Sequence, residues 1–117
     1  MAKLNKNGIV YKGKTYPLVF NINVMEKIQD EYGTVEKWGE LTDHNSGREV
    51  DLKALKFGIT EMLNEGVDEF NEEHEDKRDF FTTKTVGRII SDLGMQEITK
   101  KMNNTVVDSA VNEEKNE

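Results

Sequence analysis

A cluster of carboxylates around a histidine is the first place in this sequence where chemistry could reside. Residues Glu72 to Asp76 read Glu-Glu-His-Glu-Asp, and carboxylate and imidazole groups are common metal ligands. A metal site needs ligands that converge on one point, and neither histidine of the chain lies in an HExxH or paired-histidine spacing. The pattern therefore favours a solvated acidic face, with loose cation binding at most, and predicts no metal site.

The polar stretch Asp43–Gly47 (Asp-His-Asn-Ser-Gly) invites comparison with a calcium-binding loop. The EF-hand needs an oxygen ligand at its fifth position, glycine at the sixth and glutamate at the twelfth. Counted from Asp43, these positions hold Gly47, Arg48 and Ala54. The calcium pattern fails, and a turn-forming loop is favoured.

Nucleophilic and nucleotide chemistry have no support in the sequence. There is no cysteine, and no GxSxG, P-loop or GxGxxG motif. Carboxylate pairs occur, but none lies in an apolar setting that would raise a pKa. We therefore expect no enzymatic activity, no catalytic residue and no cofactor, and expect the protein to act by binding.

The distribution of charge along the chain argues against some classes of binding partner. The net charge is -7, and the stretch from Glu61 to Asp79 alone holds nine acidic and two basic residues, so the rest of the chain is balanced. Phosphate repulsion argues against nucleic acid as a partner. No apolar run is long enough for a membrane span, and the N-terminus lacks a signal-peptide pattern. The absence of cysteine fits a reducing cytoplasm, although a cysteine-free secreted protein would look the same.

The N-terminal third predicts a β-hairpin over residues 8–21, preceded by a flexible segment, residues 1–7. Two β-prone runs flank a loop at Lys12-Gly13-Lys14. Tyr16, Leu18 and Phe20 alternate onto one face, which we expect to be buried. Pro17 has no N–H, so it should lie where no neighbouring strand needs a donor.

Two short helices are predicted next. Asn23 is expected to cap the first, with Glu26 completing a capping box and Gly33 ending the helix. Thr34 is expected to cap the second, and Trp38 to be a core anchor under the hairpin. Helical spacing predicts the inward-facing side chains of these helices: Met25, Ile28, Tyr32, Val35, Trp38 and Leu41.

After a polar loop over 42–49, Asp51 should cap a longer helix that runs to about Glu65 and ends at Gly66. Its apolar stripe comprises Leu52, Leu55, Ile59, Met62 and Leu63. Phe57 falls opposite this stripe, so it marks either a second buried side or an exposed partner contact. The acidic stretch Val67–Arg78 reads as a frayed helix or a mobile loop.

Thr83 is a candidate cap for the last helical region, and Gly94 either bends or breaks it. The predicted inward residues are Val86, Ile89, Ile90, Leu93, Ile98, Met102 and Val106. Residues 111–117 are expected to be a disordered tail. The sequence thus predicts one small α+β domain over 8–110, mainly α, in which an N-terminal hairpin precedes short packed helices over 23–110.

This plan resembles the tail assembly chaperones of long-tailed bacteriophages, particularly the small members from phages and prophages of Gram-positive bacteria. The matching residues are the hairpin Tyr11–Phe20 and the helix Met25–Gly33, which ends in Glu-Tyr-Gly. Val86–Gly94 fits the helical part of the family pattern more loosely. The Asn45-Ser46-Gly47 loop and the acidic Val67–Arg78 stretch have no counterpart in that pattern.

The resemblance implies a non-catalytic protein of the host cell cytoplasm, absent from the mature virion. Members of this family are thought to coat the tape measure protein, keep its long apolar helices soluble and recruit tail tube protein. Self-association is plausible for a coating protein, although no sustained heptad repeat supports it.

A holdase needs adaptable apolar contacts, and Met25, Met62, Met95 and Met102 would supply them if exposed, although methionine more often fills core gaps. Our hypothesis for the partner surface combines the hairpin edge with the off-stripe phenylalanine. The candidate partner-binding residues are Phe57, Tyr11, Tyr16, Met62 and Met102.

Two other binding roles remain open at this point. One is a structural head–tail connector or minor tail subunit, although a single hairpin among helices argues against a tube subunit, which would be mainly β. The other is a small regulatory adaptor that binds protein.

Overall fold

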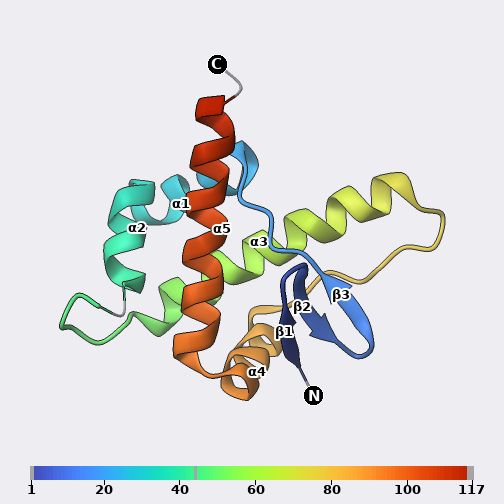
Figure 1. The fold of residues 1–117 in the computed structure, drawn as a ribbon, viewed down its shortest axis with the longest axis horizontal. Coiled ribbons are helices and arrows are strands. Elements are labelled where there is room, and N and C mark those ends of the chain that lie inside the picture. The colour runs from blue at the N-terminus through green and yellow to red at the C-terminus, as the bar shows by residue number, and fades with distance from the viewer. Residues whose placement is uncertain (1, 44, 116–117) are drawn as a thin grey trace.

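The N-terminal segment forms a three-stranded antiparallel sheet in the computed structural model, which describes residues 2–43 and 45–115. Strands β1 (Lys3–Asn5), β2 (Gly8–Tyr11) and β3 (Lys14–Tyr16) lie in the order β1-β2-β3 (Figure 1). The prediction of a flexible N-terminus is wrong for residues 3–5, because these residues pair with β2. Five helices follow the sheet, so the predicted mainly helical α+β class is confirmed.

The turn between β2 and β3 is tighter than predicted. Lys12 and Gly13 both have positive φ angles, 50° and 76°, and Tyr11 pairs with Lys14. Two central residues with positive φ characterise a two-residue hairpin turn whose twist matches that of the strands. Lys14 therefore belongs to β3 rather than to the loop. After Tyr16 the chain stays extended, and Phe20 is buried while Leu18 is half-buried.

Helices α1 (Ile22–Tyr32) and α2 (Val35–Thr42) form one side of the molecule. The predicted cap at Thr34 is confirmed, since its side chain accepts a hydrogen bond from the Lys37 N–H. The cap of α1 is Asn21 rather than Asn23, because the Asn21 side chain accepts from the Val24 N–H at 3.2 Å. Gly33 ends α1 as predicted.

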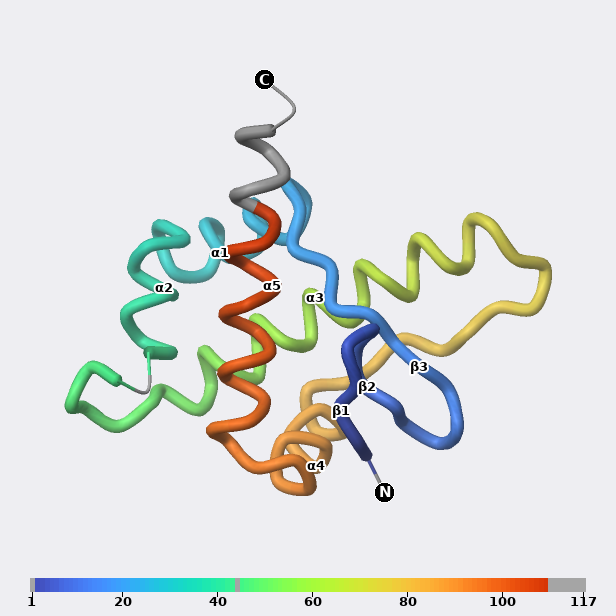
Figure 2. The backbone as a smooth tube through the Cα atoms, viewed as in Figure 1, coloured from blue at the N-terminus to red at the C-terminus, as the bar shows by residue number. Residues whose placement is uncertain are grey.

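Helix α3 (Leu52–Glu73) runs through the middle of the fold and is longer than predicted (Figure 2). Asp51 caps it, as expected. Gly66 lies inside the helix instead of ending it. The extended segment after β3 crosses α3 here: the Val19 N–H donates to the Met62 carbonyl at 3.2 Å, and a Cβ at Gly66 would lie 2.9 Å from the Pro17 carbonyl oxygen. Glycine is needed at this position for close approach rather than for a turn.

Helices α4 (Thr83–Leu93) and α5 (Met95–Lys115) complete the chain. Gly94, with φ 91°, breaks the helix between them and settles the alternative between bend and break. The cap of α4 is Thr82, one residue before the predicted Thr83. Helix α5 extends to Lys115, into the region predicted as a tail, and residues 116–117 lie outside the described residues.

The core forms where the crossing segment and the helices meet α3. Trp38 is 2% exposed, and its indole N–H donates to the Ala54 carbonyl at 2.9 Å. Its ring stacks on Phe20 at 6.4 Å between centroids, so its neighbours are α3 and the extended segment rather than the hairpin strands. The predicted core role is confirmed. The largest fully buried side chains are Ile9, Ile28, Leu55, Ile59, Met62, Leu63, Ile89, Ile98 and Met102.

Trp38 packs directly on the backbone of Gly58, and this contact yields a stability test. A Cβ at Gly58 would lie 2.2 Å from Trp38 Cζ2. We expect Gly58→Ala to lower the free energy of unfolding by about 1–3 kcal/mol, the usual cost of overpacking. Urea denaturation followed by Trp38 fluorescence measures it.

Gly39 in α2 is the matched control, because a Cβ there would meet nothing within 4 Å. Gly39→Ala should leave stability unchanged or raise it by about 0.5–1 kcal/mol through lower chain entropy and better helix propensity. Equal stabilities for the two variants would show that Trp38 does not rest on Gly58.

Candidate functional site

Three of the five predicted partner-binding residues are in the core. Met62 and Met102 are 0% exposed and Tyr16 is 8% exposed. Both methionines fill space between helices, which is the commoner use of this flexible side chain. Met62 and Met102 therefore present no surface to a partner in this structure, whereas Tyr16 reaches the wall of a hollow beside the β2–β3 turn.

The other two predicted residues are half-buried against aromatic neighbours. Phe57 meets Tyr32 edge to face, with ring centroids 5.5 Å apart, and Tyr11 lies 5.7 Å from Phe81. Of the two alternatives for Phe57, the second buried side is the one the structure shows. The five residues therefore do not form one surface, although Tyr11 and Tyr16 line the same hollow beside the β2–β3 turn.

The two sequence candidates for cation binding also have simpler structural roles. His74, at the end of α3, stacks on Phe70 at 3.8 Å between ring centroids. In the Asp43–Gly47 loop, the Asn45 N–H bonds to the Asp43 side chain in a local turn, and His44 lies outside the described residues. Among the residues that the structure describes, no group of three histidine, aspartate or glutamate side chains could hold a metal ion.

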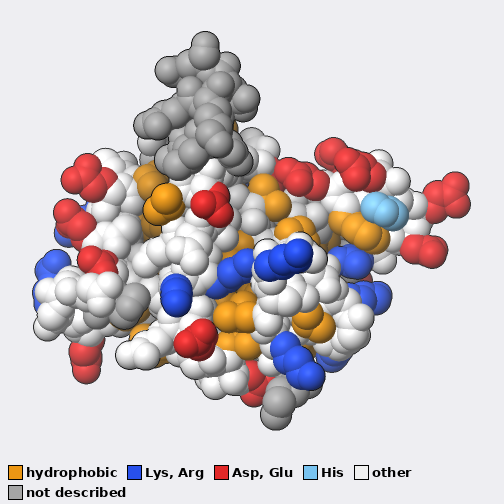
Figure 3. Space-filling view, viewed as in Figure 1, with side chains coloured by type: hydrophobic (Ala, Val, Ile, Leu, Met, Phe, Trp, Pro, Cys, Tyr) orange, Lys and Arg blue, Asp and Glu red, His pale blue; other side chains and the backbone are white. Residues whose placement is uncertain are grey.

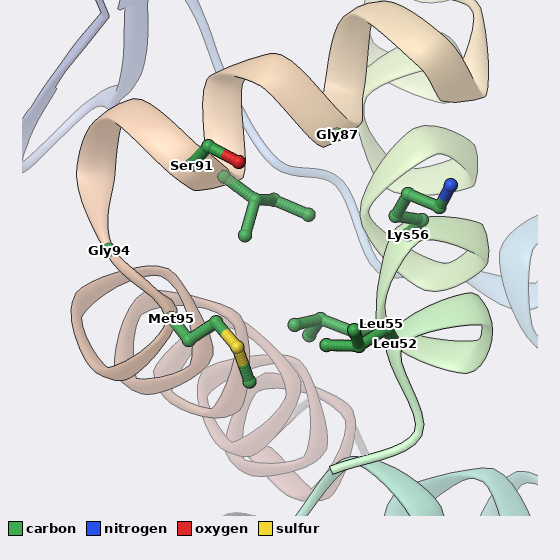
Figure 4. A pocket seen from close by; sticks show the side chains of 8 residues that line it. Leu52, Leu55, Lys56, Gly87, Ser91, Gly94 and Met95 are labelled. Atoms are coloured by element: carbon green, nitrogen blue, oxygen red, sulfur yellow. The ribbon is translucent and has the colours of Figure 1, made fainter.

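A hollow of about 460 Å³ lies where the start of α3, the outer face of α4 and the start of α5 meet (Figure 4). In the close-up, the side chains of Leu52 and Leu55 extend from α3 toward α4 and the start of α5. We call this hollow the groove, and its lining residues are Leu52, Leu55, Lys56, Gly87, Ile90, Ser91, Gly94 and Met95. Its volume lies within the range of ordinary ligand sites.

The groove is open because its α4 wall is built from small residues. Gly87, Ser91 and Gly94 recur at helical spacing, and the Lys56 side chain lies over Gly87, where a Cβ would be 3.3 Å from Lys56 Cδ. The apolar rim is accessible, since Leu52 is 57% exposed and Met95 is 39% exposed. Leu52 was predicted to face inward with its stripe, so its exposure is a correction. The groove offers apolar side chains to a partner.

Charged side chains of both signs lie near the groove. Lys56 lines it. Lys84 and Arg88 are exposed on α4, three residues before Gly87 and Ser91, and residues three apart on a helix are surface neighbours. Asp92 is exposed next to Ser91, and Glu97 is exposed two residues after Met95.

Sequence reasoning found parts of this surface without assembling it. Met95 was one of four methionines predicted to be adaptable contacts if exposed, and it is the one that lines the groove. The break at Gly94 sets the angle between α4 and α5 that opens the hollow, and the sequence left that break undecided. The sequence feature that could have indicated the groove is the row of small residues at Gly87, Ser91 and Gly94. This row lies on a different face of α4 from the buried Val86 and Ile89.

Comparison of the chain with protein-family models, with curated proteins and with solved structures gave no match. The assignment of function therefore rests on the residues and the geometry. Within the described residues, none of the helices combines the length and apolar character needed to cross a bilayer.

The projecting end of α3 concentrates negative charge. The pKa of Glu69 is raised above its ordinary value, first by partial burial and then by Glu65, Glu73, Glu72 and Asp68. A raised carboxyl pKa means that the folded state binds this proton more tightly than the unfolded state does. Ionisation of Glu69 therefore costs stability, and the cost is present above the raised pKa and disappears as the pH falls through it.

We expect Glu69→Gln to raise the melting temperature at about pH 7, where the wild-type carboxylate is ionised. The gain should vanish below the ordinary value of 4.5, where the wild-type carboxyl is also neutral. Thermal unfolding by circular dichroism across this pH range measures the difference. Glu36→Gln is the control, because this exposed glutamate in the first turn of α2 interacts favourably with the helix dipole. A gain that persists at low pH would exclude the charge explanation.

Proposed function

We propose that this protein is a non-catalytic tail assembly chaperone of bacteriophage type, which binds the long helical tape measure protein through the groove. The observation that carries the proposal is the groove itself: an accessible apolar surface, floored by buried leucine and isoleucine and rimmed by Leu52 and Met95. Exposed apolar surface of this kind marks binding sites in proteins that are otherwise well solvated. The resemblance of the hairpin and first helices to the chaperone family supplies the biological context.

A helix is the partner element that fits this surface. Amphipathic helices bind in apolar grooves through side chains at i, i+3, i+4 and i+7. The distance along α4 from Gly87 to Gly94 is about 10 Å, which corresponds to about two turns of a docked helix. One copy therefore covers a short stretch of a long partner, and many copies are needed to coat it.

The lining of the groove adds a requirement for charge. Lys56 lines the groove, so a carboxylate on the partner helix beside Lys56 is favoured. The net charge of -7 on the chain keeps the coated assembly soluble. The recruitment of tail tube protein follows from the family resemblance, and the groove is assigned to the tape measure partner.

The experiment is co-expression with the long helical protein encoded just downstream, followed by co-purification. The wild-type chain should render the partner soluble and co-elute with it. Leu52→Asp places a charge on the apolar rim, and Ser91→Trp fills the groove. Each should weaken binding by at least about tenfold, the effect expected for loss of a central contact.

Ile22→Asp is the matched control, because Ile22 is 65% exposed on α1, away from the groove. This variant should bind as the wild type does. Circular dichroism of all variants separates loss of binding from loss of folding. An insoluble partner with the wild-type chain eluting alone would contradict the chaperone role. Full binding by folded Leu52→Asp and Ser91→Trp would contradict the groove.

A further inference from the structure

A second hollow, of about 380 Å³, lies between the β2–β3 turn and the segment that precedes α4. We call it the cationic cleft. Its lining includes Lys12, Lys14, Lys77 and Arg78 against a single carboxylate, Asp79. The excess of positive charge is notable because the whole chain carries -7. A cleft with this charge attracts carboxylates.

Arg78 is held rigidly in this cleft. Its Nη1 donates to the Thr15 carbonyl at 2.9 Å, and its guanidinium lies between the rings of Tyr16 and Phe70, at 4.7 and 4.0 Å from their centroids. The Arg78 N–H donates to the Asn71 side-chain oxygen at 2.8 Å, and the Asn71 side-chain amide donates to the Arg78 carbonyl at 3.0 Å. An arginine fixed in this way loses little freedom when it binds an anion.

The charges of the cleft are not neutralised by these contacts. Arg78 donates to a backbone carbonyl, and the Lys77 ammonium donates to the carbonyls of Asn71 and His74 at the end of α3. Lys12 lies over the Tyr11 ring, and Lys14 is exposed. Carbonyl groups and rings orient these cations but carry no compensating unit charge.

The complementary charge lies next to the cleft, on the same chain. Exposed carboxylates cover the last turns of α3 and the residues just after it, namely Asp68, Glu69, Glu72, Glu73, Glu75 and Asp76. We call this region the acidic end. Figure 3 shows its red side chains gathered around the projecting end of α3, with blue side chains below them. In addition to partial burial, Asp68, Glu72 and Glu73 all contribute to the raised pKa of Glu69.

We propose that two copies of this chain pair about a two-fold axis, with the acidic end of each copy against the cationic cleft of the other. A two-fold axis makes contacts reciprocal, so two adjacent patches of opposite charge on one surface each meet their complement. Phe80 lines the cleft and is 56% exposed, which provides an apolar contact at the centre of the interface. This pairing does not depend on the role of the groove.

The dimer should be weak and sensitive to salt. Exposed ion pairs contribute little individually, and their attraction is screened at high ionic strength. Sedimentation velocity of the full chain, at protein concentrations up to about 0.5 mM, should show dimer in about 20 mM salt and monomer in about 300 mM salt.

Charge reversal provides the decisive test. Lys12→Glu with Lys14→Glu makes the cleft negative, and the four changes Asp68→Lys, Glu72→Lys, Glu73→Lys and Glu75→Lys together make the acidic end positive. Each reversal variant alone should be monomeric in low salt, because like charges then face each other. An equimolar mixture should form a one-to-one heterodimer, because both contacts across the axis become attractive again.

Lys27→Glu with Lys37→Glu is the control for the first variant, and Glu26→Lys, Asp30→Lys, Glu31→Lys and Glu40→Lys together are the control for the second. All of these are surface changes on α1 and α2, and these controls should dimerise as the wild type does. Circular dichroism verifies folding, and the two reversal variants test the interface independently. A wild-type chain that is monomeric in low salt, or a mixture that stays monomeric, would overturn the proposal. Dimers that survive either reversal would do the same.

Discussion

The rest of the structure depends on close packing against the backbone of α3. Gly58 and Gly66, eight residues apart on this helix, expose its backbone to neighbouring elements because they have no side chain. At Gly58 the Trp38 ring occupies the space where a side chain would be, and at Gly66 the Pro17 carbonyl does. These contacts attach α2 and the extended segment after β3 to the same helix. Because a protein interior tolerates little change in volume, these two positions set how α1, α2 and the sheet are arranged.

A second set of α3 residues positions the two hollows proposed as binding surfaces. Asn64 and Asn71, seven residues apart, each form a reciprocal pair of hydrogen bonds with the backbone of the returning chain, at Phe81 and Arg78. A side-chain amide can donate and accept at once, so it can satisfy an extended backbone in the way a neighbouring strand would. This attachment sets where α4 begins, and it brings Arg78 to the rings of Tyr16 and Phe70. The groove and the cationic cleft both depend on it.

Local signals in the sequence were sufficient for much of the fold. The caps at Thr34 and Asp51, the end of α1 at Gly33 and the burial of Ile59, Leu63 and Ile89 follow from residue type and helical spacing. Each of these features depends on neighbours within a few residues, so the local sequence contains enough information to predict it.

The caps of α1 and α4 were predicted two residues and one residue too late, and the other errors occurred where distant parts of the chain meet. A glycine such as Gly66 can end a helix or admit a crossing chain, and the choice is made by Pro17, nearly fifty positions away. Strand β1 is three residues long and mostly polar, so only its pairing with β2 reveals it. The groove was not predicted either, because its lining residues come from three helices and do not form the apolar stripe of any single helix. Met62 was assigned to a partner surface because methionine suits both cores and contacts.

The length of α3 keeps the groove apart from the acidic end. Its 22 residues span about 33 Å. The groove lies at the N-terminal end of this helix and the acidic end lies at the other, while the cationic cleft reaches α4 at Thr85, two residues before Gly87 of the groove. Two linked grooves bind a long helical partner more tightly than one, because the second contact is made at high effective concentration. Weak pairing and a short groove therefore support each other: each contact is reversible, and avidity along a repetitive partner supplies the strength that a single contact lacks.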